Sequence, residues 1–80
     1  MKRQSVPNLH TLSGIEVIRA LERLGFRQVR QRGSHVVLRK DSLERAAGCS
    51  VPLHKELKIG TIKSILRQAK VDQEEFLLIV

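Results

Sequence analysis

Two amphipathic segments with a helical repeat restrict the folds open to this chain, and the first of them is bounded at both ends. Ser13-Gly-Ile-Glu16 has the pattern of a capping box, in which two side chains accept reciprocal backbone hydrogen bonds. Apolar residues then recur at helical spacing: Val17, Ala20, Leu21 and Leu24. Gly25 suits the end of a helix, because glycine adopts the left-handed conformation readily. We therefore expect a helix over residues 14–24 with one side buried.

The second amphipathic segment lies near the other end of the sequence and predicts a helix over residues 59–69. Its apolar stripe consists of Ile62, Ile65, Leu66 and Ala69. Asp72-Gln-Glu-Glu75 then has the character of a helix start, which favours a short final helix over residues 73–79. The apolar run that closes the sequence would also suit a strand, so both interpretations stay open here.

Three short strands are indicated between the two amphipathic segments. Residues 26–32 and 35–40 are separated by Gly33-Ser34, which suits a tight hairpin turn. A polar connection over residues 41–46 leads to a third strand over residues 48–54. Three residues of that strand share one side: Cys49, Val51 and Leu53. Because Pro52 has no backbone N–H, we expect this strand at an edge of the sheet, or to end there.

This order of elements predicts a small α+β fold with the arrangement α-β-β-β-α and a short C-terminal helix. A chain of 80 residues has room for one domain, which we place over residues 13–79, preceded by an irregular arm over residues 1–12. A three-stranded antiparallel sheet with both helices on one face would bury the two apolar stripes. The other face of the sheet would stay open to solvent.

Positive charge is concentrated in the first half of the chain. Residues 1–40 contain nine Lys and Arg against two acids, which accounts for the whole net charge of +7, whereas residues 41–80 contain six of each sign. Such asymmetry favours a polyanionic partner, most often nucleic acid, over a solubility surface or a face for an acidic protein. The candidate RNA-binding residues are Arg27, Arg30, Arg32, Arg39 and Lys40, with Lys63 and Arg67 on the second helix.

Several classes of protein are disfavoured by the same composition. The single Cys49 forms no internal disulfide and is interpreted as a small core residue, and no Cys/His set has the spacing of a zinc site. Only two aromatic residues are present, which argues against base stacking on aromatic platforms. No segment has the length and apolarity of a membrane span or a signal peptide, so we expect a cytoplasmic protein without metal or small-molecule cofactor.

His35 is the candidate catalytic residue on the open face of the sheet. Strand alternation turns Val36 and Leu38 to the core and leaves His35 on the other side, near the arginines. RNA can be cleaved without a metal by a proton-transfer group and positive charge, and histidine and arginine supply these. No acidic cluster suited to two-metal hydrolysis is evident. A plain surface histidine remains the alternative at this point.

Three further residues are candidates for support of the chemistry. Gly33 would allow a phosphate backbone to approach closely, and Ser34 offers a hydroxyl beside it, although a turn residue is the simpler interpretation. His54 follows the third strand and could act as a partner acid or phosphate contact, or be a polar loop residue. His10 in the arm is interpreted as incidental.

An ordered set of motifs resembles the HicA (YcfA-like) mRNA interferase toxins over residues 13–79. The motifs are Ser13-Gly-Ile-Glu16, Leu21-Glu-Arg-Leu-Gly-Phe26, Arg30-Gln-Arg-Gly-Ser-His35, Val51-Pro-Leu-His54 and Gly60-Thr-Ile-Lys-Ser-Ile-Leu-Arg-Gln68. The resemblance implies a fold like the double-stranded-RNA-binding domain, ribosome-independent cleavage of mRNA, and neutralisation by a HicB-like antitoxin that covers the active site. It also implies that His35 is the catalytic histidine, and it matches Gly33, Pro52 and His54 to family positions.

The sequence departs from the family pattern at two places. The connection from Asp41 to Gly48 contains Leu43 and two alanines where a short polar turn is usual, and Ile59 stands where a proline often precedes the glycine. Neither position touches the histidine motif, but both bear on the hairpin length and on the start of the second helix. The competing hypotheses are a non-catalytic RNA- or DNA-binding module that uses the same basic face, and a protein-interaction module.

Overall fold

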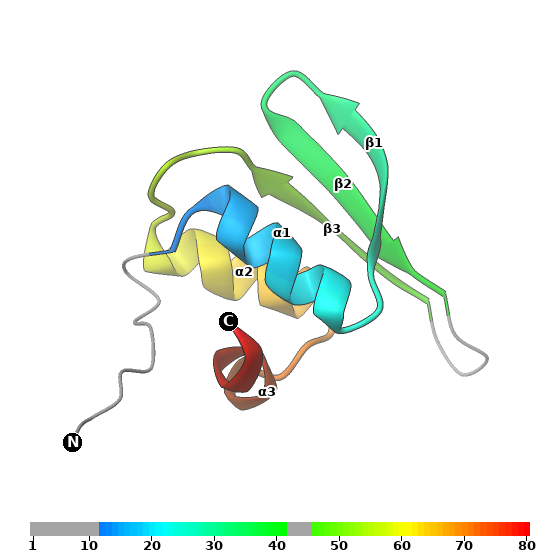
Figure 1. The fold of residues 1–80 in the computed structure, drawn as a ribbon, viewed down its shortest axis with the longest axis vertical. Helices are drawn as coiled ribbons and strands as arrows, with labels where there is room; N and C mark the ends of the chain where they lie inside the picture. The colour runs from blue at the N-terminus through cyan, green and yellow to red at the C-terminus, as the bar shows by residue number, and fades with distance from the viewer. Residues whose placement is uncertain (1–11, 42–45) are drawn as a thin grey trace.

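The computed structural model describes residues 12–41 and 46–80, and these residues follow the predicted order of elements (Figure 1). The elements are α1 (Gly14–Arg23), β1 (Arg27–Arg32), β2 (His35–Lys40), β3 (Ala47–Pro52), α2 (Ile59–Ala69) and α3 (Gln73–Ile79). α1 and α2 lie on the same side of the sheet, and the β1–β2 turn projects beyond them (Figure 1). The α+β prediction is therefore confirmed. The predicted arm, apart from Leu12, and residues 42–45 of the predicted connection lie outside the described residues.

Local signals set both ends of α1, as predicted. The Ser13 N–H donates to Glu16 Oε1 (2.8 Å), and the Glu16 N–H donates to Ser13 Oγ (3.1 Å), which completes the capping box. At the other end Gly25 has φ +100°, and the Phe26 N–H reaches back to the Leu21 carbonyl (3.0 Å). This is the Schellman arrangement, which satisfies carbonyls that the last helical turn would leave unpaired.

The three strands pair antiparallel in the order β1-β2-β3, so β2 is central and Pro52 lies on an edge strand, as expected. β1 begins at Arg27 instead of residue 26, because Phe26 is buried and completes the end of α1. β3 covers 47–52 instead of 48–54. It ends at Pro52 because the following segment turns toward α1, where the Gly14 N–H donates to the His54 carbonyl (2.9 Å).

The core lies between the helices and the covered face of β2 and β3. Both predicted helical stripes are buried in it, together with four strand residues: Val36, Leu38, Cys49 and Val51. All six residues of β1 are exposed, and the pairing with β2 shifts register between Gln28 and Arg30, so that Val29 has no partner there. The outer strand of the sheet is thus held mainly by its pairing with β2.

The C-terminal segment is helical, which settles the choice between helix and strand. Phe76 of α3 is fully buried, and the Arg23 guanidinium at the end of α1 donates to the Ile79 carbonyl (2.6 Å). α2 begins at Ile59 without a side-chain cap, and just before it the Leu57 N–H donates to the Leu12 carbonyl (2.8 Å). The isoleucine in place of proline therefore leaves the predicted start of this helix unchanged.

Candidate active site on the open face of the sheet

Strand pairing arranges the open face in three rows that run across the sheet. The hairpin row contains Arg32, His35 and Pro52, and the middle row contains Arg30, Val37 and Ser50. The distal row contains Arg27, Arg39 and Gly48. Paired residues in a sheet point to the same side, so each row brings together side chains from three strands. The face therefore has a histidine at one end and arginines along its length.

His35 is exposed at the first position of β2, next to the hairpin turn. Val36 and Leu38 are 3% and 0% exposed, so the predicted alternation is confirmed and His35 stands on the side opposite the core. Its cross-strand neighbour on β1 is Arg32, and its neighbour on β3 is Pro52. An imidazole here is accessible to a large substrate and has a guanidinium in the same row.

The turn beside His35 has the geometry that its two residues favour. Gly33 has φ +57°, whereas Ser34 does not have a positive φ, which is the pattern of a type II′ turn. A Cβ on Gly33 would meet nothing within 4 Å, so the surface above the glycine is open. The Gln31 side-chain amide donates to the Gly33 carbonyl (3.1 Å) and braces the turn from β1. A bulky ligand can therefore reach the backbone at this point.

The exit of β3 is fixed beside the same turn. The Leu53 N–H donates to the Ser34 carbonyl (2.6 Å), and the next residue, His54, accepts the backbone hydrogen bond from Gly14. His54 is exposed, as is Ser34. The structure thus brings the Gly33-Ser34-His35 segment and the Leu53-His54 segment to one end of the sheet, which is where the chemistry was predicted.

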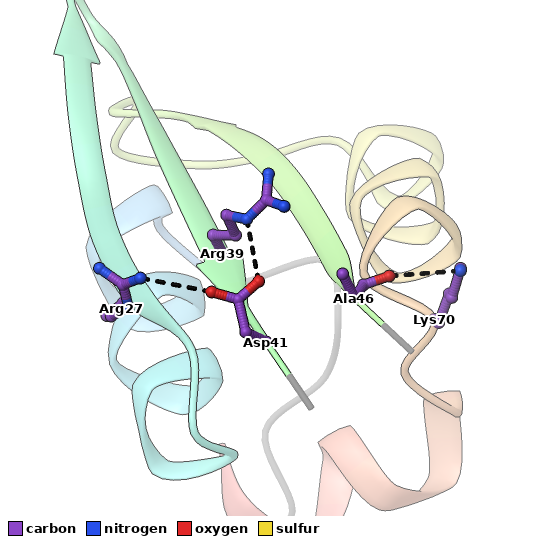
Figure 2. Close-up of polar contacts among 5 residues, drawn as sticks. All are labelled: Arg27, Arg39, Asp41, Ala46 and Lys70. Atoms are coloured by element: carbon purple, nitrogen blue, oxygen red, sulfur yellow. Dashed lines mark hydrogen bonds and ion pairs between the residues drawn. The ribbon is translucent and has the colours of Figure 1, made fainter. Parts of the chain in front are cut away.

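At the distal row, two predicted RNA-binding residues are ion-paired with an acid (Figure 2). Asp41 contacts Arg39 at 3.1 Å and Arg27 at 3.4 Å. The hydrogen bond from Arg39, followed by the weaker contribution of Arg27, holds the pKa of the Asp41 carboxyl below its usual range. Among the residues that the structure describes, these are the only ion pairs, so Arg30 and Arg32 have no acidic partner there.

Three other predicted contacts do not join the open face. Lys40 follows the alternation of Val36 and Leu38 to the covered side, where its Nζ lies 5.9 Å from the centre of the Phe26 ring. On α2, Gln68 accepts a hydrogen bond from the Ser50 N–H of β3 (3.4 Å), so this flank of the helix faces the sheet edge. Lys63 and Arg67 lie on the opposite flank, because successive helical residues are about 100° apart.

Cys49 is buried in the core, as predicted, and burial raises the pKa of its thiol to about 11. Because the thiolate is the reactive form, we expect native protein at pH 8 to react slowly with an aromatic disulfide reagent. Protein unfolded in guanidinium at the same pH should react at the rate of an ordinary thiol. Equal rates in the two states would contradict the buried position. The Cys49→Ala variant serves as the blank.

Two other searches of the described residues were made for functional features. Within residues 12–41 and 46–80, no three His, Cys, Asp or Glu side chains lie close enough to hold a metal ion. No helix in the same ranges combines the length and apolarity that crossing a membrane requires.

Asp41 and Gly14 are the residues near this face that the sequence interpretation missed. Asp41 carried a signal, since residues 39 and 41 share one side of an extended strand and opposite charges there can pair. Gly14 was interpreted only as part of the capping box, yet a Cβ at this position would collide with the Pro52 carbonyl oxygen. That second role depends on tertiary packing, and no local pattern marks it.

The fold and the open face define a class: a small α+β domain of α-β-β-β-α order that presents an exposed histidine among arginines. The family model described as "HicA toxin of bacterial toxin-antitoxin" matches residues 14–71, which is well over half of the chain. The chain belongs to the HicA toxin family. It is thus a toxin of the toxin–antitoxin type, and this membership implies an antitoxin partner. A comparison with curated proteins finds no match to it.

Proposed function

We propose that this protein is a metal-independent endoribonuclease that cleaves mRNA, with His35 as its catalytic residue. The observation that carries the proposal is the exposed position of His35 in one row with Arg32, beside the open Gly33-Ser34 turn. Membership of a toxin family supports it, because cleavage of mRNA is a direct way to arrest growth. The cytoplasm, where mRNA is translated, is the compartment that this function requires.

The proposed reaction is an attack by the RNA on its own backbone. A base removes the proton of a 2′-hydroxyl, the 2′-oxygen bonds to the adjacent phosphorus, and the P–O5′ bond breaks as the leaving oxygen gains a proton. A histidine can serve as the base or the acid of these transfers near neutral pH, and such assistance accelerates a reaction by roughly 10²–10⁴. His54, at the same end of the sheet, is the candidate for the second proton-transfer group.

The surroundings of His35 supply the remaining requirements of the proposed site. Gly33 leaves room for a phosphate to approach the turn, and the Ser34 hydroxyl is exposed beside it. Arg30 and Arg32 in the neighbouring rows provide fixed positive charge toward the phosphorane. Lys63 and Arg67 can contribute only to RNA that also passes over α2, since they lie away from this face.

We further propose that a HicB-like antitoxin neutralises the protein by covering the open face. The face is exposed, carries most of the unpaired arginines of the described strands, and contains the candidate catalytic histidine. A protein seated there would exclude RNA from His35 without any change in the fold of the toxin. An acidic surface on that partner would complement the arginines.

The reaction type is tested by the products and by the effect of a chelator. We expect cleavage of single-stranded RNA to continue in excess EDTA and to leave 2′,3′-cyclic phosphate or 3′-phosphate ends, because the attacking oxygen belongs to the RNA. End-group analysis by mass spectrometry would establish this. Strict dependence on Mg²⁺, or 5′-phosphate products, would contradict the mechanism. Tight RNA binding with no cleavage would instead favour the alternative of a non-catalytic nucleic-acid-binding module.

A further inference from the structure

The distal row contains a carboxylate held between two guanidinium groups from adjacent strands. Arg39 Nε approaches Asp41 Oδ1 (3.1 Å), and Arg27 Nη2 approaches the other oxygen, Oδ2 (3.4 Å) (Figure 2). Each oxygen therefore has its own arginine. The three side chains are 54–68% exposed, so the cluster lies at the surface and a ligand from solvent can reach it.

Backbone register, and not chance contact, brings these groups together. Arg27 lies directly opposite Arg39 in the β1–β2 pair, and Asp41 follows Arg39 on the same side of the chain. The position opposite Arg39 on β3 is Gly48, which is exposed and has no side chain to cover the arginine. The two guanidinium groups thus converge over a surface that is open on the β3 side.

Two converging guanidinium groups are a preferred environment for a phosphate as well as for a carboxylate. Arginine donates paired, charge-assisted hydrogen bonds to the oxygens of either anion. A phosphodiester presents two charged oxygens, as Asp41 does, so it could take the place of the carboxylate. Exposed ion pairs contribute little to stability, and a polyanion that binds elsewhere on the same face can displace one readily.

We propose that Arg27 and Arg39 form a second phosphate-binding subsite for RNA, which the Asp41 carboxylate occupies in the free protein and vacates when RNA binds. This inference rests on the proposed function, because it concerns the same substrate on the same face. Four residues of β2 separate Arg39 from His35, a distance of about 13 Å along a strand. RNA that spans both ends of the face gains the subsite, whereas a shorter fragment at the hairpin row does not. Asp41 therefore makes binding depend on substrate length.

The test measures RNA binding in a protein that cannot cleave. Full-length His35→Ala protein, with and without Asp41→Asn, is titrated against a labelled oligouridylate of about 12 nucleotides by fluorescence anisotropy at several salt concentrations. With Asp41 removed, the subsite should be free, and we expect binding up to about fivefold tighter at low salt. Each additional phosphate contact should steepen the slope of log K against log salt by about 0.7.

Two comparisons separate the subsite from a general effect of charge. Asp72→Asn makes the same charge change at the start of α3, outside the sheet, and should leave the slope unchanged. In an Arg27→Gln/Arg39→Gln background, Asp41→Asn should have no effect, because the groups that it frees are gone. An unchanged slope for Asp41→Asn, an equal effect of Asp72→Asn, or an effect that persists without the arginines would each overturn the proposal.

The outcomes also distinguish this inference from the function on which it rests. If Arg30→Gln/Arg32→Gln lowers the slope while Asp41→Asn does not change it, the RNA site stands and the second subsite is wrong. If the His35→Ala protein binds the oligouridylate without any salt dependence, the basic face is not an RNA site, and both proposals fail together. Circular dichroism of each variant checks that the exposed substitutions leave the fold intact.

Discussion

Replacement of His35 by alanine should reduce RNA cleavage by about 10²–10⁴, the usual contribution of one proton-transfer group. Induction of the variant in cells should no longer arrest growth. The free energy of unfolding should change by less than about 0.5 kcal/mol, because the side chain is exposed and makes no core contact. RNA binding should also be retained, since the arginines remain. The measurements are a cleavage assay on a defined transcript and a denaturant melt of the same preparation.

His54→Ala is the matched control for this experiment, since it removes an exposed imidazole from the same end of the sheet. If His35 alone transfers the proton in the rate-limiting step, His54→Ala should lower the rate much less than His35→Ala does. Comparable losses would indicate that the two histidines act as a pair, one as base and one as acid. Undiminished cleavage and toxicity in the His35→Ala protein would refute the proposed mechanism.

Replacement of Gly14 by alanine should destabilise the protein by about 3 kcal/mol, which is a large effect for one methyl group. The added Cβ would overlap the Pro52 carbonyl oxygen and come within 3.1 Å of Leu53 Cα, and both neighbours are backbone atoms that cannot rotate away. The helix would have to move from the sheet and strain the hydrogen bond from the Gly14 N–H to the His54 carbonyl. For a domain of this size, the melting temperature should fall by about 10–20 °C.

Gly60→Ala provides the comparison for Gly14→Ala. Gly60 also lies in the first turn of a helix, but a Cβ there would meet nothing within 4 Å. Alanine at that position should be neutral or stabilise by about 0.4–1 kcal/mol, because it reduces the freedom of the unfolded chain. Similar melting temperatures for the two variants would show that α1 does not pack on the β3 exit as the structure describes. Because this contact also positions His54, residual cleavage in folded Gly14→Ala protein should be lower than in the wild type.

The elements that the sequence predicts well are those whose signals are local. The capping box at Ser13 and Glu16 and the glycine at position 25 fixed the limits of α1 to within a residue. The side on which His35 lies followed from alternation with Val36 and Leu38, which needs only the knowledge that this segment is a strand. The same rule placed Lys40 on the covered side, but its charge was given more weight than its position.

The arrangement of charge could not be predicted in the same way. Arg27 and Arg30 look equivalent in the sequence, yet pairing with β2 puts only Arg27 opposite Arg39 and within reach of Asp41. The register shift at Val29 contributes to this, because it changes which residues of β1 lie opposite β2. Lys63 and Arg67 were grouped with the strand arginines by charge, and packing of α2 turned them to another surface.

The sequence by itself determined the order of elements, the buried stripes of both helices, and the exposure of a histidine beside a glycine turn. Each of these depends on residues a few positions apart, whose effects on the backbone are short in range. Only the tertiary structure decided which arginines are free and which are paired, that Gly14 must be a glycine, and that the turn and the β3 exit meet. These outcomes depend on contacts between residues distant in the chain, and sheet register and helix packing are what bring such residues together.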